Sequence, residues 1–199
     1  MHFKFLHTAV VLACLATSTG ALAADKGWYF LGALGPSSYG GNVQTDTDSD
    51  LARQGKTGIQ SSSAGSSTGY KAMVGYQLAP SLALEGGYVD MGSLGYNASF
   101  TGGNIAIDSR ATGFNFSALG MAPVNYQLSM FGKVGYTIGS VTAKGSSGGT
   151  TVSLTQEKSS LGLGFGGIYY VTPKVGLRAE WERLYSDINL LSFGIQAKF

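Results

Sequence analysis

The sequence predicts an all-β fold: an eight-stranded, antiparallel, up-and-down β-barrel that crosses a membrane. Three observations support this prediction. Apolar residues recur at every second position in eight segments, the connections between these segments alternate between short and long, and charged residues make up only 12% of the 199-residue chain. Soluble domains carry about 25% charged residues, so a soluble domain of this composition would have a poorly hydrated surface.

Each segment has the length and pattern of a membrane-crossing strand. A period of two is typical of a strand whose two faces meet different surroundings. Hydrocarbon offers no partner to a free backbone N–H or C=O, so a sheet inside a bilayer must close on itself, and each tilted strand needs about 9–11 residues. We expect the strands at residues 27–35, 68–78, 81–91, 110–121, 126–141, 159–171, 174–185 and 189–199.

The connections predict which end of the barrel carries its loops. Tight connections hold three of the four prolines, and the long ones are rich in Gly, Ser, Thr and Asp. Short turns at one end and long polar loops at the other are typical of outer-membrane barrels. The tight connections are 79–80, 122–125 and 172–173, and the long ones are 36–67, 92–109 and 142–158.

The stretch GLGFGG, residues 162–167, has the G-x-G-x-x-G spacing of a dinucleotide-binding turn. It precedes IYYVTP, in which no helix can begin, and a nucleotide turn needs that helix. Gly162, Gly164 and Gly166 instead share one parity of a strand. The interior of an eight-stranded barrel is only just wide enough for side chains, so we expect these glycines to point inward and make room for larger groups.

The inward parity also collects most charged residues of the strands. Glu85 and Arg178 each lie four residues beyond a tight turn, on opposite walls of the expected barrel, so they should meet across the lumen. With Lys133 and Glu180 they would balance two positive and two negative charges, as a narrow lumen requires. A structural plug and an ion gate with exchanging partners both remain open, whereas a soluble ligand-binding barrel would point its apolar parity inward. The inward set is Lys71, Gln77, Glu85, Asn115, Ser117, Lys133, Arg178, Glu180, Glu182, Ser192, Gln196 and Lys198.

Aromatic residues gather near the ends of the expected strands, as they do at both interfaces of a membrane. They predict an interfacial girdle at each end of the barrel. Trp28, Tyr76, Tyr169 and Phe199 would mark the end with short turns, and Tyr70, Tyr88, Phe114 and Tyr136 the end with long loops.

The N-terminus has the pattern of a secretory signal peptide. Lys4 precedes the apolar stretch TAVVLACLA, and small residues at 21–23 suit a signal peptidase. We therefore expect residues 1–23 to be a cleaved signal peptide and residues 24–199 to be one outer-membrane barrel domain. Lipid attachment at Cys14 is the alternative, but it would leave a very short apolar core.

Removal of residues 1–23 would also remove both histidines and the single cysteine. A nucleophilic serine needs a base tuned near neutral pH, so we expect no enzyme activity. We expect no cofactor and no metal: Asp46, Asp48 and Asp50 alternate like the start of a calcium loop, but Leu51 and Thr57 replace its glycine and glutamate. The formal charge of +2 with no basic stripe predicts no nucleic-acid partner.

Several stretches resemble the OmpA family, the N-terminal membrane barrel of outer membrane protein A and its stand-alone relatives. They are GWYFLGALGPSSY, VGYQLAPSLALEGGYVDMG, FGKVGY and YYVTPKVGLRAEWERLY, and their order spans nearly the whole chain after residue 23. The ending SFGIQAKF resembles the C-terminal assembly signal of outer-membrane proteins, with Ser192, Gly194, Ala197 and Phe199 at its positions.

The resemblance implies an eight-stranded barrel inserted from the periplasm by chaperones and the outer-membrane assembly machinery, among outer-membrane lipids and lipopolysaccharide. It implies an interior network at Glu85, Lys133, Arg178 and Glu180. Family members can place a lysine and a glutamate where this chain has Leu119 and Ile168, so we expect a smaller network. Many members carry a C-terminal peptidoglycan-binding domain, but this chain ends at Phe199 and should be stand-alone.

Three hypotheses of function follow. The first is a structural barrel that supports envelope integrity, with at most a narrow gated ion path and loops exposed at the surface. The second is an adhesin that binds a host or surface ligand through residues 36–67 and 92–109. The third is a channel for small apolar molecules, which would need an apolar lumen and is disfavoured by the inward charges.

Overall fold

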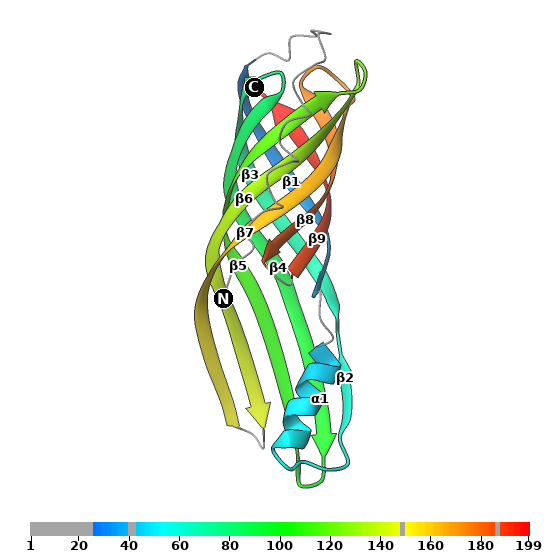
Figure 1. The fold of residues 1–199 in the computed structure, drawn as a ribbon, viewed down its shortest axis with the longest axis vertical. Helices are drawn as coiled ribbons and strands as arrows, with labels where there is room; N and C mark the ends of the chain where they lie inside the picture. Colours follow the sequence, from blue (N-terminus) through cyan, green and yellow to red (C-terminus); the bar gives the residue numbers. More distant parts are fainter. Residues whose placement is uncertain (1–25, 40–42, 148–149, 186–187) are drawn as a thin grey trace, which may run out of the picture.

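One closed ring of strands dominates the computed structural model, which describes residues 26–39, 43–147, 150–185 and 188–199 (Figure 1). The predicted signal peptide, residues 1–23, lies outside the described residues. The ring runs β4-β3-β1-β9-β8-β7-β6-β5, every neighbouring pair is antiparallel, and β5 pairs back to β4. The predicted eight-stranded barrel is therefore confirmed. The ring strands are β1 Gly27–Tyr39, β3 Ser66–Ala79, β4 Leu82–Phe100, β5 Gly103–Pro123, β6 Leu128–Ser147, β7 Thr150–Tyr170, β8 Val175–Tyr185 and β9 Ile188–Lys198.

In the described part of the chain, two elements lie outside the ring. The helix α1, Val43–Arg53, and the short strand β2, Gln60–Ser63, both fall in the connection between β1 and β3, and β2 pairs with residues 96–99 of β4. Both elements lie at the end opposite the tight turns (Figure 1). No helix in the described part of the chain is long and apolar enough to cross a bilayer.

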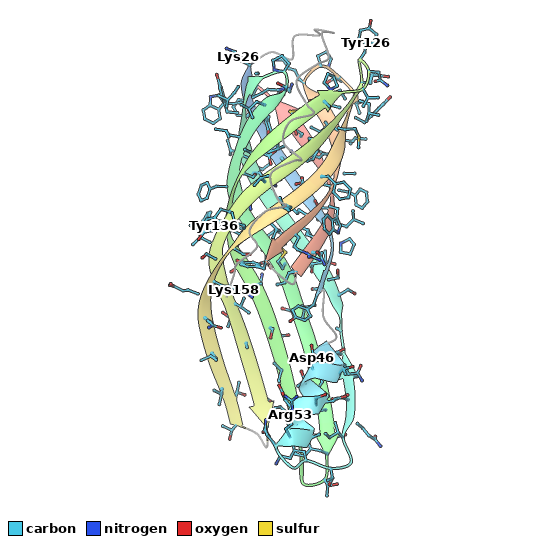
Figure 2. All side chains as sticks on the ribbon, viewed as in Figure 1. Lys26, Asp46, Arg53, Tyr126, Tyr136 and Lys158 are labelled. Atoms are coloured by element: carbon cyan, nitrogen blue, oxygen red, sulfur yellow. The ribbon has the colours of Figure 1, made fainter. Side chains whose placement is uncertain are left out.

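Strict alternation separates the two faces of the ring. Leu34, Val134, Leu163 and Phe193 point outward and are exposed, while residues of the other parity, such as Leu31, are buried. Exposed apolar side chains surround the half of the barrel that carries the tight turns, and Tyr136 lies in the part of this band that is nearer the extension (Figure 2). An apolar band of this kind is what lipid chains require of a barrel wall.

The prediction of long loops at 92–109 and 142–158 is wrong, because most of these residues continue the strands. β4 and β5 run on to a hairpin turn at Thr101–Gly102, and β6 and β7 remain paired out to Ser147 and Thr150. Serine, threonine and glycine are abundant here, and neither face meets hydrocarbon. Gly92 and Ser93 interrupt the apolar alternation, which resumes only in short runs at residues 94–100 and 105–107, while the backbone ladder continues. The predicted loop 36–67 likewise contains α1, β2 and the outer ends of β1 and β3.

We call the part beyond the ring the extension. It comprises residues 92–109 of β4 and β5, residues 142–147 and 150–158 of β6 and β7, and also β2 and α1. A bulge in β4 between Asp90 and Ser93 begins it, with Gly92 at φ +70°, a value that favours glycine. The extra residue changes which positions of β4 are buried. Before the bulge the buried residues have odd numbers, such as Val89 and Met91, and after it they have even numbers, such as Tyr96 and Ala98.

A charge on the lipid-facing wall tests the membrane assignment. Val134 lies in the middle of the outward face of β6 and is 50% exposed. We expect Val134→Arg to lower the free energy of unfolding by about 2–4 kcal/mol, the cost of arginine near the bilayer midplane. The measurement is urea unfolding of the protein folded into lipid vesicles.

Val152→Arg is the matched control, since Val152 is 65% exposed but belongs to the extension. We expect its effect to stay within about 0.5 kcal/mol. Equal small effects at the two positions would show that Val134 does not face lipid.

Candidate functional site: a charged plug in the lumen

Six ionisable side chains of the described residues meet inside the barrel, with three positive and three negative charges. Their side chains are at most 3% exposed, and their formal charges cancel. Charges taken out of water are tolerated when each is paired and hydrogen-bonded. We call this group the charge cluster: Lys71 on β3, Glu85 on β4, Lys133 on β6, and Arg178, Glu180 and Glu182 on β8.

Arg178 joins two opposite walls of the ring. Its guanidinium donates to both carboxylate oxygens of Glu85, with Nη2 3.2 Å from Oε2, and the same Nη2 lies 2.8 Å from Oε2 of Glu180. The ring of Phe131 stacks below the guanidinium, 4.3 Å from Cζ to the ring centroid, and the side-chain oxygen of Gln196 accepts a further bond at 3.2 Å. Arginine offers a planar fork of donors that suits such a site better than lysine does.

The two lysines complete the pairing. Nζ of Lys133 lies 2.9 Å from Glu182, 3.1 Å from Glu180 and 3.5 Å from Glu85. Nζ of Lys71 lies 2.9 Å from Glu180 and also donates to Glu182. Each carboxylate therefore contacts at least two cations, so no charge in the cluster depends on one partner.

Inward glycines provide the space that the charge cluster occupies. A Cβ built on Gly164 would lie 2.9 Å from Cβ of Glu182, and one on Gly166 would lie 2.6 Å from the ring of Phe131. A Cβ on Gly75 would overlap the ring of Tyr29, whose hydroxyl donates to Oε1 of Glu85 at 2.8 Å. The glycine column at 162–166 thus points inward, as its parity predicts.

Apolar layers lie on both sides of the charge cluster. Chain order along β4 runs from Ala83 through Glu85 to Val89, so the charge lies between two apolar positions. The layer toward the tight turns contains Tyr29, Ala83, Leu119, Met121, Phe131 and Ile168. The layer toward the extension contains Leu31, Met73, Val89, Met91, Ala111, Leu184, Tyr185 and Leu190.

The network of interior charges is larger than the four residues that the sequence predicts. The structure brings together all four residues expected from the sequence, Glu85, Lys133, Arg178 and Glu180, and adds Lys71 and Glu182. Parity places both additional residues inside the barrel, but it does not say how far a long lysine side chain reaches along a tilted strand. Leu119 and Ile168 belong to an apolar layer.

The predicted girdle residues lie at the two ends of the outward face. Trp28 contacts Tyr76 with 4.9 Å between ring centroids, and at the other end Tyr88 lies between Tyr70 at 6.4 Å and Phe114 at 5.7 Å. Tyr136 and Tyr169 are exposed on the same face. Their function as membrane anchors stays a prediction.

The predicted assembly signal lies on β9, the strand that closes the ring against β1. Ser192 is buried, Gly194 lies close to the backbone of Gly32 and Ala33, Ala197 pairs with Phe30, and Phe199 is exposed. Its recognition by the assembly machinery stays a prediction.

The family follows from the sequence match. The family model described as the OmpA-like transmembrane domain matches residues 23–191. The chain belongs to this family. It is an outer-membrane β-barrel, in agreement with the resemblance that its strands and turns show.

Solved structures of other outer-membrane barrels are similar. The N-terminal β-barrel domain of Pseudomonas aeruginosa OprF has a TM-score of 0.50 at 13% identity, covering 87% of this chain and 98% of that one. Neisserial surface protein A gives 0.46 at 17% identity, covering 86% and 97%. Ail of Yersinia pestis gives 0.41 at 17% identity, covering 87% and 98%. No curated protein sequence matches this chain.

Removal of one cation tests whether the charge cluster is interdependent. We expect Lys71→Met to lower the free energy of unfolding by about 3–5 kcal/mol, because Glu180 and Glu182 lose a buried partner. The double variant Lys71→Met/Glu182→Gln should cost less than the sum of the two single variants, since it removes both members of a pair. Urea unfolding in lipid vesicles measures all three.

Lys158→Met removes a lysine from the exposed part of β7 and serves as the control, with an expected effect within about 0.5 kcal/mol. If Lys71→Met were as mild as Lys158→Met, the charge cluster would not contribute to stability as described.

Proposed function

We propose that this protein is a structural barrel of the outer membrane with a plugged lumen and an extension that faces the cell exterior. One observation carries the proposal: a neutral, fully paired charge cluster lies between two apolar layers. An ion that crossed the lumen would have to pass both apolar layers and disrupt pairs that are buried on every side. A plug therefore accounts for the geometry better than a gate whose partners exchange.

The proposal includes export and assembly. Residues 1–23 direct the chain across the inner membrane and are removed, and the residues at 192–199 guide insertion among outer-membrane lipids and lipopolysaccharide. The girdle aromatics fix the depth of the barrel in the bilayer. The protein contributes to envelope integrity by its bulk and its paired interior, and it catalyses no reaction.

Conductance in planar lipid bilayers tests the plug. We expect the folded wild-type protein to give no unitary current steps. Glu85→Ala should give none either, because Arg178 still forms its ion pair with Glu180 and both apolar layers stay closed. A wide porin in the same bilayer is the positive control. Wild-type steps whose size changes in Glu85→Ala would replace the plug with an ion gate.

A second function, binding of a host or surface ligand, is favoured by the shape of the extension. β7 pairs with β6 along almost its whole length, from Thr150 to Tyr169, but it pairs with β8 only from Leu163 onward. Within the described residues, 150–162 of β7 therefore offer backbone N–H and C=O groups along one edge. An unpaired edge of this length can accept an extended segment of a protein partner.

Shortening the β6–β7 hairpin separates the two functions. Deletion of residues 143–154 joins Thr142 to Thr155, which already lie opposite each other in the ladder. If the extension binds a surface ligand, the variant should lose attachment to host cells or matrix proteins while bacteria keep their resistance to large antibiotics. Unchanged attachment would remove the β7 edge from consideration.

A further inference from the structure

A cavity lies where the extension joins the ring, and neither the charge cluster nor the exposed β7 edge uses it. Its volume is about 310 Å³. Met91 and Ala111 at its base belong to the apolar layer that covers the charge cluster, and Val141 packs against that layer. The cavity is therefore closed toward the lumen and lies on the side of the extension.

Small inward residues leave this space empty of side chains. Ser109 and Ala111 project from β5, and their neighbours across the sheet include Val141 and Ala143 of β6. Leu94 and Ile107 form the wall near α1. The result is a mostly apolar hollow with few polar groups, which is the usual character of a small-molecule site of about 300–1,000 Å³.

The helix α1 covers the cavity and is fixed to the sheet beside it. Asp48 accepts hydrogen bonds from Tyr96 at 2.5 Å and from Ser61 at 2.6 Å, and Gln44 donates to the backbone oxygen of Ser61 at 2.9 Å. Leu51 packs against Tyr96 in a small apolar cluster. These contacts keep α1 above the hollow, so the cavity does not depend on a ligand to stay formed.

The Tyr96 hydroxyl, which donates the hydrogen bond to Asp48, does not titrate near neutral pH. Tyr96 lies in the extension, outside the membrane-spanning part of β4, where burial and its hydrogen bond to Asp48 raise the pKa of its hydroxyl to about 12. A raised tyrosine pKa favours the protonated form, so the Tyr96 hydroxyl keeps its proton at neutral pH and loses it only as the pH rises through about 12.

The polar groups of the cavity favour a cation. Asp46 is the only charged residue among the described residues that line it, and no described cation forms an ion pair with Asp46. Thr47 and Ser109 add hydroxyls, and Tyr39 and Tyr96 also line the cavity, where an aromatic ring favours a cation over an anion. A carboxylate ligand would meet Asp46 without a compensating positive charge.

We propose that this cavity, lined by α1 and by β1, β4, β5, β6 and β9, binds a small amphiphile with an apolar or aromatic body and one basic nitrogen. The apolar body lies against Leu94, Ile107 and Val141, and the nitrogen lies at the rim beside Asp46 and Thr47. The site takes its ligand from the outer medium and does not pass it on, because the apolar layer closes its base. Binding at this site does not require the lumen to be plugged, so the proposal is independent of whether the lumen conducts ions.

Three related indoles test the site: tryptamine, the neutral alcohol tryptophol and the anionic indole-3-propionate. Equilibrium dialysis against the wild-type protein in lipid nanodiscs, with empty nanodiscs subtracted, measures their binding. We expect tryptamine to bind with a dissociation constant below about 1 mM. Tryptophol should bind about fivefold more weakly and indole-3-propionate more weakly still, since one exposed ionic contact contributes up to about this factor.

Two pairs of variants locate the site. Asp46→Asn should weaken tryptamine about fivefold to the level of tryptophol and leave tryptophol unchanged, whereas Asp50→Asn, on the same helix but paired with Arg53, should change neither. Ser109→Phe fills the cavity and should abolish binding of all three indoles, whereas Ser153→Phe, on the exposed part of β7, should not.

The shift in gel migration on heating shows whether each variant folds, and Leu94→Trp replaces Ser109→Phe if that variant does not. Binding that survives in the filled cavity would overturn the proposal. So would equal affinity for the three indoles, or no binding by the wild-type protein at millimolar concentration.

Discussion

The structure depends on one constraint: a strand that crosses hydrocarbon must find partners for every backbone N–H and C=O within the protein. The ring satisfies this because β1 pairs with β9 as well as β3, and β4 pairs with both β3 and β5. Closure with eight strands then fixes the interior as a space just wide enough for side chains. Outside the bilayer the constraint disappears, and there the sheet opens into the extension, where the outer part of β7 has no second partner strand among the described residues.

The narrow interior explains why charge and glycine occur together. A ring of eight strands can hold three cations, three anions and the rings of Tyr29 and Phe131 at one level only if some inward positions beside them carry no side chain. Gly75, Gly164 and Gly166 supply that space. The paired charges then hold β3, β4, β6 and β8 together through the lumen, where apolar side chains alone would give no specific register.

The sequence predicted the membrane-spanning half well because hydrocarbon on one face and a lumen on the other impose a period of two. Glu85 and Arg178 could be placed opposite each other because each lies at the same distance from a tight turn. The extension was missed because its many Ser, Thr and Gly residues weaken the apolar alternation, and because the bulge between Asp90 and Ser93 shifts the parity of β4. Lys71 and Glu182 were assigned to the correct face but not to the charge cluster, because the reach of a side chain along a tilted barrel depends on the register between distant strands.

Backbone amide exchange at the seam between β1 and β9 tests the closed ring most directly. Leu31 pairs with Gln196 and Gly32 with Ile195, so the protein in lipid vesicles should exchange these amides as slowly as those of the β5–β6 ladder around Ser117 and Gly135. The β7 edge at residues 151–159 should exchange much faster. Exchange at the seam as fast as at the β7 edge would show that the ring is open, and the membrane barrel, its plug and its site in the extension would all fall with it.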